Sequence, residues 1–518
     1  MAAPSSPESI QAPPANPGGL AARTVKGAAW LLAWRTASRL LGLASTLILA
    51  RVLVPADFGL VAMATAFAAS VDALSQLGLQ DALVRRVDDD KSLYSTAFTL
   101  QFGRALITGL AIAASIPVVA WWFAEPRLGA ILLVLAGCSV ISGLENTGVA
   151  EFRRAMRFDM QFKLLLFPRL LQVAVTVPAA LLLQSYWALL AGIVVSQVAR
   201  TGMGYVLHPF RPRFRLAGWR ELAGFSFWTW ASCVISLAWE RGDLFVLGPA
   251  VGPAQLGLYI LAMELGILPV TEIVAPAADA LFTAFAAAQK SGANSLHHAP
   301  MVAAALVMCV MPITITLSCG SGYVVAALLG PKWAEASPLI AMLAWLCLFS
   351  PISFVCSVAL NANGFARRNF IGKLTASTVR LVFLLAVVAL TRRLDYIVAA
   401  VTACVAIESA AFILLLRGIG AARLRPMAGP VCRTLLAGLT VVAFLWLAGL
   451  AWQDVAMPSY AALVCAGLLG MLVTLLYSLL ILLLWRLAGR PAGPETRIIE
   501  LAAGFIRPLQ ARMLRRQA

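Results

Sequence analysis

The chain has few charged residues for its length. Only 12% of its 518 residues are Asp, Glu, Lys or Arg, whereas 61% are hydrophobic. Because a soluble protein is typically about 25% charged, this composition excludes an ordinary water-soluble particle. Histidine is scarce too. The three histidines, His208, His297 and His298, fall near the ends of apolar segments, so a histidine-centred site inside a membrane is excluded.

Motifs for common enzyme and cofactor chemistry are also missing. No GxxxxGK[ST] phosphate loop occurs, which argues against ATP hydrolysis by this chain. None of the nine cysteines forms a CxxC pair, and most lie in apolar segments, as expected of small buried side chains. The run from Asp88 to Asp90 lies among basic residues and is expected to be a solvated charge run. We therefore assign no catalytic residue, no metal ligand and no cofactor.

Long apolar stretches dominate what is present. About fourteen stretches are close to the roughly 20 residues that a helix needs to cross a bilayer. Strand-like alternation is missing, so the predicted fold class is an all-α polytopic membrane protein. The predicted spans are 27–51, 57–80, 96–122, 128–148, 162–184, 186–207, 222–248, 256–282, 300–328, 336–359, 370–391, 395–416, 432–452 and 461–487.

The basic residues follow a one-sided pattern. Most of the 40 Lys and Arg residues fall in alternate loops and in the two terminal segments. The opposite set of loops carries Arg51, Arg127, Lys332, Arg392 and Arg393. Cytoplasmic loops are enriched in Lys and Arg, so both termini are predicted to be cytoplasmic. The net charge of +17 then faces anionic phospholipids rather than nucleic acid.

An internal repeat relates two parts of the chain. Residues 55–60, PADFGL, resemble residues 253–258, PAQLGL, at an offset of 198 positions that also matches Trp30 to Trp228. Two parallel six-helix lobes related by a pseudo-twofold axis are therefore expected, with a site between them. The predicted parts are a disordered tail (1–22), two lobes (23–215 and 216–420), two further helices (421–487) and a basic amphipathic tail (488–518).

Several arginines fall inside predicted spans, where each costs about 2.5–3.5 kcal/mol on insertion scales. Arg35 and Arg39 are four residues apart and share one helix face, which suits bidentate binding of a diphosphate. The alternative is that they pair with Asp72 or with carboxylates of the seventh span. The predicted cavity arginines are Arg35, Arg39, Arg104, Arg169, Arg241 and Arg380.

Carboxylates inside or at the ends of spans are the candidates for ion coupling or for a latch between lobes. They are Asp72, Glu240, Asp243, Glu264, Glu272 and Glu408. Glu240, Arg241 and Asp243 cannot all face one cavity, because successive helical residues point about 100° apart. A static network within the seventh span remains the alternative for these three. Pro269, Pro276 and Pro312 predict helix kinks.

The run from Leu49 to Ala64, followed by Leu77 to Arg86, resembles the opening of the polysaccharide transporter family. These are the Wzx-type oligosaccharide flippases of the multidrug/oligosaccharidyl-lipid/polysaccharide superfamily. The stretch from Arg241 through Tyr259 also resembles that family. The resemblance implies secondary transport of an undecaprenyl-diphosphate-linked oligosaccharide across a bacterial inner membrane, from the inner to the outer leaflet. A polysaccharide polymerase and chain-length machinery are the implied candidate partners.

Three other functions stay open. A multidrug or peptidoglycan-precursor exporter would share the fold, although a cation exporter would favour an acidic cavity. A membrane polymerase or ligase would need a larger outer loop than any here. A scaffold of a polysaccharide assembly complex would not transport at all. Flipping assays separate the scaffold from the predicted function, which is not enzymatic, and bond formation on lipid-linked sugar by the purified protein would indicate the polymerase or ligase.

Overall fold

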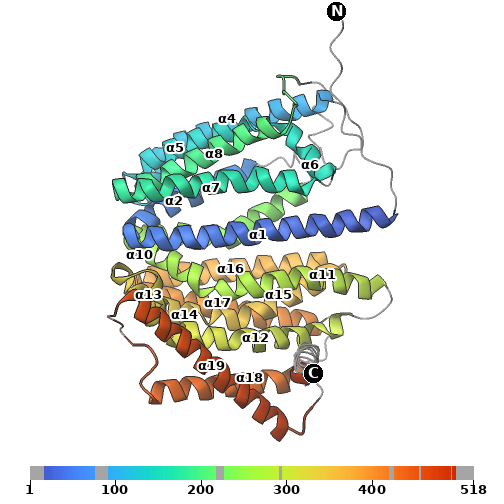
Figure 1. Ribbon diagram of the computed structural model, residues 1–518, viewed down its shortest axis with the longest axis vertical. Coiled ribbons are helices and arrows are strands. Elements are labelled where there is room, and N and C mark those ends of the chain that lie inside the picture. The colour runs from blue at the N-terminus through green and yellow to red at the C-terminus, as the bar shows by residue number, and fades with distance from the viewer. Residues whose placement is uncertain are drawn as a thin grey trace, which may run out of the picture. The chain divides into compact units, whose positions relative to one another are not determined.

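The structure is a computed structural model that describes residues 17–75, 91–155, 157–216, 227–290, 295–418, 425–453, 455, 457–491 and 493–496. These residues are almost entirely helical, as the sequence predicts (Figure 1). The amphipathic helix predicted beyond residue 496 and the run from Asp88 to Asp90 lie outside the described residues. Residues 17–22, predicted as part of a disordered tail, belong to the first helix.

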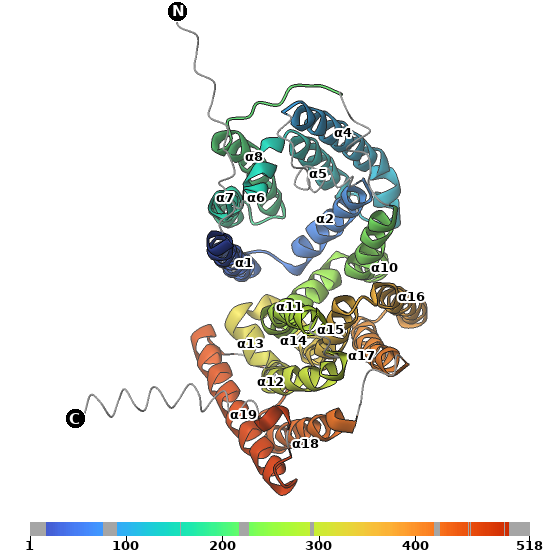
Figure 2. The same ribbon diagram turned by 90° about the vertical axis from the view of Figure 1, so that its right-hand side faces the viewer.

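The chain divides into two compact units. The first comprises residues up to Leu53 together with Met63–Leu237, and the second comprises Val54–Ala62 together with the chain from Ala238 onward. The helices of the first unit are α1 (Pro17–Val52), α2 (Pro55–Ser75, of which the first turns belong to the second unit), α4 (Lys91–Trp122), α5 (Leu128–Gly143), η1 (Thr147–Val149), α6 (Ala150–Arg154), α7 (Phe158–Leu183) and α8 (Trp187–Leu207). Within it α4 packs on α5, and α7 packs on both α8 and α1 (Figure 2).

Most of the second unit begins within α10 (Phe227–Gly266), whose first turns belong to the first unit. Its other helices are η2 (Val270–Val274), α11 (Ala275–Lys290), η3 (Ser295–His297), α12 (Ala299–Cys319), α13 (Ser321–Leu328), η4 (Pro331–Trp333), α14 (Ala336–Leu343), α15 (Leu346–Ala362), α16 (Ala366–Thr391), α17 (Leu394–Gly418), α18 (Arg425–Leu447) and α19 (Ser459–Leu487). Here α15 packs on α12 and α17, and α18 packs on α12 and α19.

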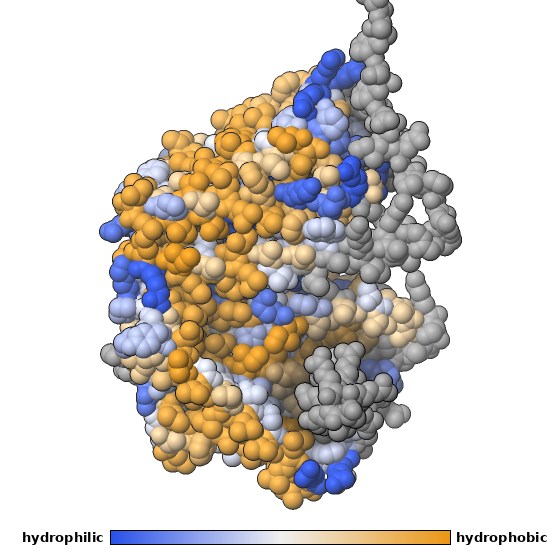
Figure 3. All heavy atoms as spheres, in the orientation of Figure 1, coloured by the Kyte–Doolittle hydropathy of each residue, from blue (hydrophilic) through white to orange (hydrophobic). Residues whose placement is uncertain are grey.

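Twelve helical segments of the described chain are long and apolar enough to cross a membrane. The chain is therefore a multi-pass membrane protein. Two further predicted spans, 128–148 and 27–51, correspond to α5, which has 16 residues, and to α1, whose apolar part carries Arg35 and Arg39. The number of fourteen spans stays a prediction. On the face shown in Figure 3, apolar side chains cover the sides of the helices, and polar ones gather mainly at their ends.

Breaks in the helices follow glycine and proline. Gly252, with φ 78° and ψ 172°, interrupts α10 between the predicted seventh and eighth spans. A π-helical turn, η2, follows Pro269, where a kink is predicted. The predicted span 300–328 is not one helix, because it breaks at Gly320 between α12 and α13. A Cβ there would lie 2.7 Å from the carbonyl oxygen of Thr316, so the close approach favours glycine.

The two copies of the repeated motif meet each other within the second unit. A Cβ on Gly59 would lie 1.8 Å from the carbonyl oxygen of Pro253, and a Cβ on Gly257 would lie 1.8 Å from that of Pro55. This reciprocity is what a twofold axis between the two motifs produces. The helices α7 and α16 are also alike: each has 26 residues and each is followed by a left-handed residue, Gln184 and Arg392.

Candidate functional site

Three cationic side chains line one side of α1. Arg35 is exposed and Arg39 is half-buried, and their spacing of four residues places them on one face. Gly42 continues this stripe about 10 Å beyond Arg35. Nη2 of Arg169, from α7, lies 3.0 Å from the place that a Cβ on Gly42 would take. We call Arg35, Arg39 and Arg169 the α1 arginine line.

The packing of α7 on α1 positions Arg169. The rings of Trp30 and Phe162 lie 4.9 Å apart, and Arg169 follows three turns after the first residue of α7. Nη1 of Arg169 donates to Oε1 of Gln172 at 2.8 Å. Its Nε is buried and makes no hydrogen bond within the described residues. Because Gln172 is neutral, this contact leaves the charge of Arg169 uncompensated by any residue that the structure describes.

Arg104 and Asp72 form an ion pair between α4 and α2. Nη1 of Arg104 lies 2.8 Å from Oδ1 of Asp72 and donates to Oγ of Ser75 at 2.9 Å. Thr108, one turn along α4, donates to the same hydroxyl at 2.9 Å. The sequence placed both charged residues inside spans and assigned Arg104 to the cavity. In the structure Arg104 neutralises Asp72, which is therefore engaged by an arginine other than Arg35 or Arg39.

A second pair in the first unit has no counterpart among the predicted site residues. Nε of Arg200, on α8, lies 3.1 Å from Oε1 of Glu145, which also accepts from Nε2 of Gln197 at 3.2 Å. Glu145, Arg200 and Gln161 line a cavity of about 100 Å³. Both charged residues lie in or beside predicted spans, which is the signal that marks them, but their partnership is not visible in the sequence.

A buried ion pair joins α16 to α10 in the second unit. Nη2 of Arg380 contacts Oδ2 of Asp243, and each side chain is 12% exposed. The hydroxyl of Tyr259 donates to the same carboxylate oxygen at 2.8 Å. Sequence reasoning missed the role of Tyr259, although this residue follows directly after the second copy of the repeated motif. Arg380 and Arg169, both predicted as cavity arginines, thus have different surroundings.

Glu408 on α17 is buried near this pair. The charges of Arg380 and Lys373 act on its carboxyl group. The other predicted acidic residues lie on α10 and η2: Glu264 is half-buried, and the exposed Glu272 accepts from the hydroxyl of Thr271 at 3.2 Å. Arg241 is half-buried on α10, and the side chain of Glu240 lies outside the described residues. Asp243 and Glu408 are therefore the predicted acidic residues that the structure brings near Arg380.

A metal or cofactor site is not apparent in the described part of the chain. No three His, Cys, Asp or Glu side chains there are placed to hold a metal ion. The arrangement offers two kinds of chemistry instead: an uncompensated guanidinium suited to an anion, and ion pairs that neutralise one another.

Residues 48–338, more than half of the chain, match the family described as polysaccharide biosynthesis protein. The chain belongs to this family. Among the relatives of this polysaccharide biosynthesis protein is the succinoglycan biosynthesis transport protein ExoT of Rhizobium meliloti, 23% identical over 62% of this chain and 66% of the relative. Others are the teichuronic acid biosynthesis protein TuaB of Bacillus subtilis, 21% identical over 56% and 59%, and the lipopolysaccharide biosynthesis protein WzxC of Escherichia coli, 22% identical over 62% and 66%. The matches thus span less than two thirds of these relatives.

Solved structures share the fold of this polysaccharide biosynthesis protein. The lipid II flippase MurJ in an inward closed conformation matches with a TM-score of 0.68 at 13% identity, over 88% of this chain and 99% of that one. A multidrug resistance MATE family transporter in an inward-facing conformation matches with a TM-score of 0.54 at 15% identity, over 74% and 95%. Identities this low show the fold alone.

Proposed function

We propose that this protein is a secondary transporter that moves an undecaprenyl-diphosphate-linked oligosaccharide from the inner to the outer leaflet of a bacterial inner membrane. The observation that carries the proposal is Arg169, whose guanidinium lies on the arginine stripe of α1 with a buried Nε that lacks a hydrogen-bond partner within the described residues. A half-buried cation without an acidic partner among the described residues is costly in a membrane, and an anionic ligand removes that cost.

The α1 arginine line suits the diphosphate of such a lipid. Arginine presents a planar fork of donors that binds phosphate oxygens in pairs. Arg35 and Arg39 lie on one face, and Arg169 lies over the next turn of the same stripe. In this proposal the three side chains replace the water that the headgroup loses on entering the protein, while the lipid chain stays in the bilayer.

The cluster of Asp243, Tyr259, Arg380 and Glu408 is the proposed coupling element. The carboxylate of Asp243 already has a cationic partner in Arg380, whereas Glu408 is buried nearby and has the chemistry to take up and release a proton. Glu264 and Glu272 remain further candidates. The basic terminal segments are proposed to face the cytoplasm, where they would meet anionic phospholipids.

Replacing Arg35 and Arg39 by Gln in a strain that lacks the native gene tests the proposal. Polymer export is expected to stop while the protein still inserts, because Gln remains polar but lacks the charge and the guanidinium group. The matched control is Arg51→Gln, at the other end of α1, which is expected to keep export. Normal export by the Arg35/Arg39 double variant would remove the arginine line from the site.

The fold likeness to a lipid II flippase favours one second candidate, a peptidoglycan-precursor exporter. Its substrate carries the same diphosphate, so the arginine line fits both. The two are separated by supplying liposomes that contain the purified protein with either labelled lipid II or a lipid-linked polysaccharide repeat unit. Faster movement of lipid II would favour the second candidate.

A further inference from the structure

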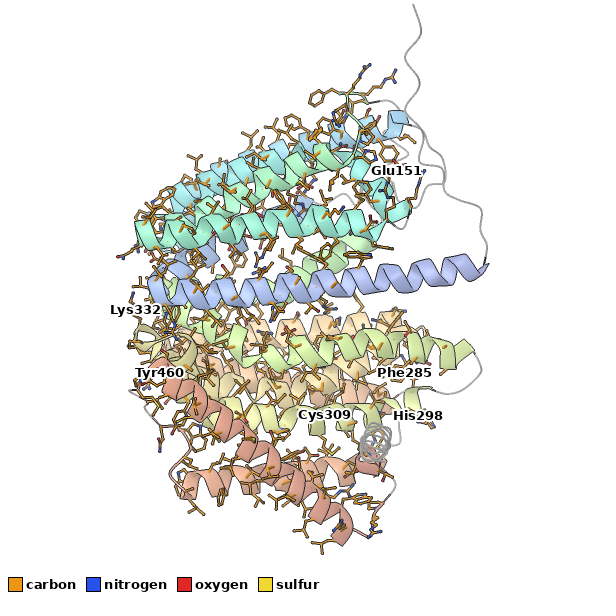
Figure 4. All side chains as sticks on the ribbon, in the orientation of Figure 1. Glu151, Phe285, His298, Cys309, Lys332 and Tyr460 are labelled. Carbon is orange, nitrogen blue, oxygen red and sulfur yellow. The ribbon has the colours of Figure 1, made fainter. Side chains whose placement is uncertain are left out.

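A cavity of about 690 Å³ lies at one end of the second unit. Its walls come from α13, from η4 and the start of α14, and from the loop between α18 and α19. The neighbouring residues Lys332 and Tyr460 lie at this end of the unit, whereas His298 lies at the other end (Figure 4). Lys332 belongs to the loops that the basic-residue pattern places outside the cytoplasm. The cavity therefore opens at the end predicted to be external.

The cavity is held open by specific contacts rather than by a loose loop. The amide of Trp452 donates to the carbonyl oxygen of Cys319 at 2.9 Å, and the hydroxyl of Tyr323 donates to Oε1 of Gln453 at 2.8 Å. A Cβ on Gly322 would lie 2.1 Å from the carbonyl oxygen of Gln453, so the loop lies directly on α13. These contacts fix the loop against α13 and make the cavity a built feature.

The lining is uncharged but not purely apolar. Ser337, Ser459 and Gln453 supply polar atoms, and Val325, Val455 and Met457 supply apolar surface. The hydroxyls of Ser321 and Ser337 lie 3.0 Å apart, and each can accept a further hydrogen bond. No Asp, Glu, Lys or Arg is among the described lining residues, so a charged ligand would be buried without a counter-charge. An alkyl chain would displace water from the lining hydroxyls and offer them no hydrogen bond in its place.

We propose that this cavity binds uncharged sugar units at the external side of the membrane. A pyranose carries hydroxyls around its rim and C–H groups on its faces, which matches a lining of hydroxyl, amide and apolar groups. A volume near 690 Å³ falls within the range of about 300–1,000 Å³ that is usual for small-molecule sites. The inference rests on the proposed function, because it assigns the glycan of the lipid-linked substrate to this cavity and the diphosphate to the α1 arginine line. The sugar comes either from a repeat unit that has just crossed or from finished polymer.

Cysteine protection tests this proposal. Ala334 is exposed and lines the cavity, whereas its neighbour Glu335 is exposed and does not line it. Ala334→Cys and Glu335→Cys variants are labelled in intact cells with a membrane-impermeant maleimide. The parent chain, whose eight described cysteines all lie within helices, gives the background labelling. Three strains are compared: one with the complete pathway, one without the polymerase, and one without the initiating glycosyltransferase.

Labelling of Ala334→Cys is expected to slow about tenfold where sugar is present, as nine-tenths occupancy requires, and Glu335→Cys is expected not to change. Protection in both sugar-containing strains identifies the lipid-linked repeat unit, and protection only with the polymerase identifies the polymer. Equal labelling of Ala334→Cys in all three strains, or no labelling in any, overturns the proposal. Polymer export by the wild-type chain is measured in the same cells, so failure of the proposed function is seen separately.

Discussion

Nη2 of Arg169 lies 3.0 Å from the place that a Cβ on Gly42 would take. Glycine at this position leaves α1 open to the guanidinium of a neighbouring helix, on the stripe that carries Arg35 and Arg39. A half-buried cation is thereby held where an arginine pair already exists. The proposed recognition of a diphosphate depends on this arrangement.

A larger residue at Gly42 is expected to displace Arg169 without unfolding the protein. The nearest atom is the flexible end of a side chain, so Gly42→Leu can be accommodated when the guanidinium moves away. Undecaprenyl diphosphate should then bind about tenfold or more weakly, the loss of one charge-assisted contact. Binding is measured with purified protein. Gly137→Leu is the control, because nothing lies within 4 Å of a Cβ there; equal losses in both variants would contradict the assignment.

Removing only one charge of the ion pair between Asp243 and Arg380 is expected to destabilise the protein more than removing both. Each side chain is 12% exposed, so Asp243→Asn leaves a buried arginine without its counter-charge, at a cost of roughly 3–5 kcal/mol. The double variant Asp243→Asn, Arg380→Met should recover much of this loss. Thermal unfolding in detergent measures both. A double variant that is less stable than Asp243→Asn alone would show that the charges are not the cause.

Even a single methyl group is expected to disrupt the contact between the repeated motifs. A Cβ on Gly59 or on Gly257 would lie 1.8 Å from a backbone carbonyl oxygen, so Gly59→Ala and Gly257→Ala should each destabilise the protein by about 1–3 kcal/mol. Gly137→Ala, in open space on α5, should be neutral or stabilising by up to about 1 kcal/mol. Unfolding temperatures in detergent that do not differ among the three variants would refute the contact.

Ion coupling is expected to depend on the buried carboxylates of the second unit. Glu408→Gln removes a titratable group beside Arg380 and should make transport into liposomes less dependent on an imposed proton or sodium gradient. Glu264→Gln is measured alongside. If neither substitution changes the gradient dependence, these residues are not the coupling groups. Insertion and yield serve as the control for folding.

The hydrophobic runs and the repeat can be recognised in the sequence, because membrane spans and duplicated motifs depend on the types of neighbouring residues. The pairing of Asp72 with Arg104, and of Asp243 with Arg380, cannot be recognised there, because the sequence leaves the rotation of each helix about its axis undetermined. The repeat relates Gly59 to Gly257, yet only the structure shows that the two glycines meet. Likewise, the break at Gly320 depends on packing against Leu469 as well as on the local chain.

Binding of undecaprenyl diphosphate to purified Arg169→Gln protein tests the central claim most directly, with Arg169→Lys and Arg51→Gln beside it. The account predicts a dissociation constant raised at least about tenfold in Arg169→Gln, partial recovery in Arg169→Lys because lysine keeps the charge but not the fork, and no change in Arg51→Gln. Unaltered binding by Arg169→Gln would contradict it.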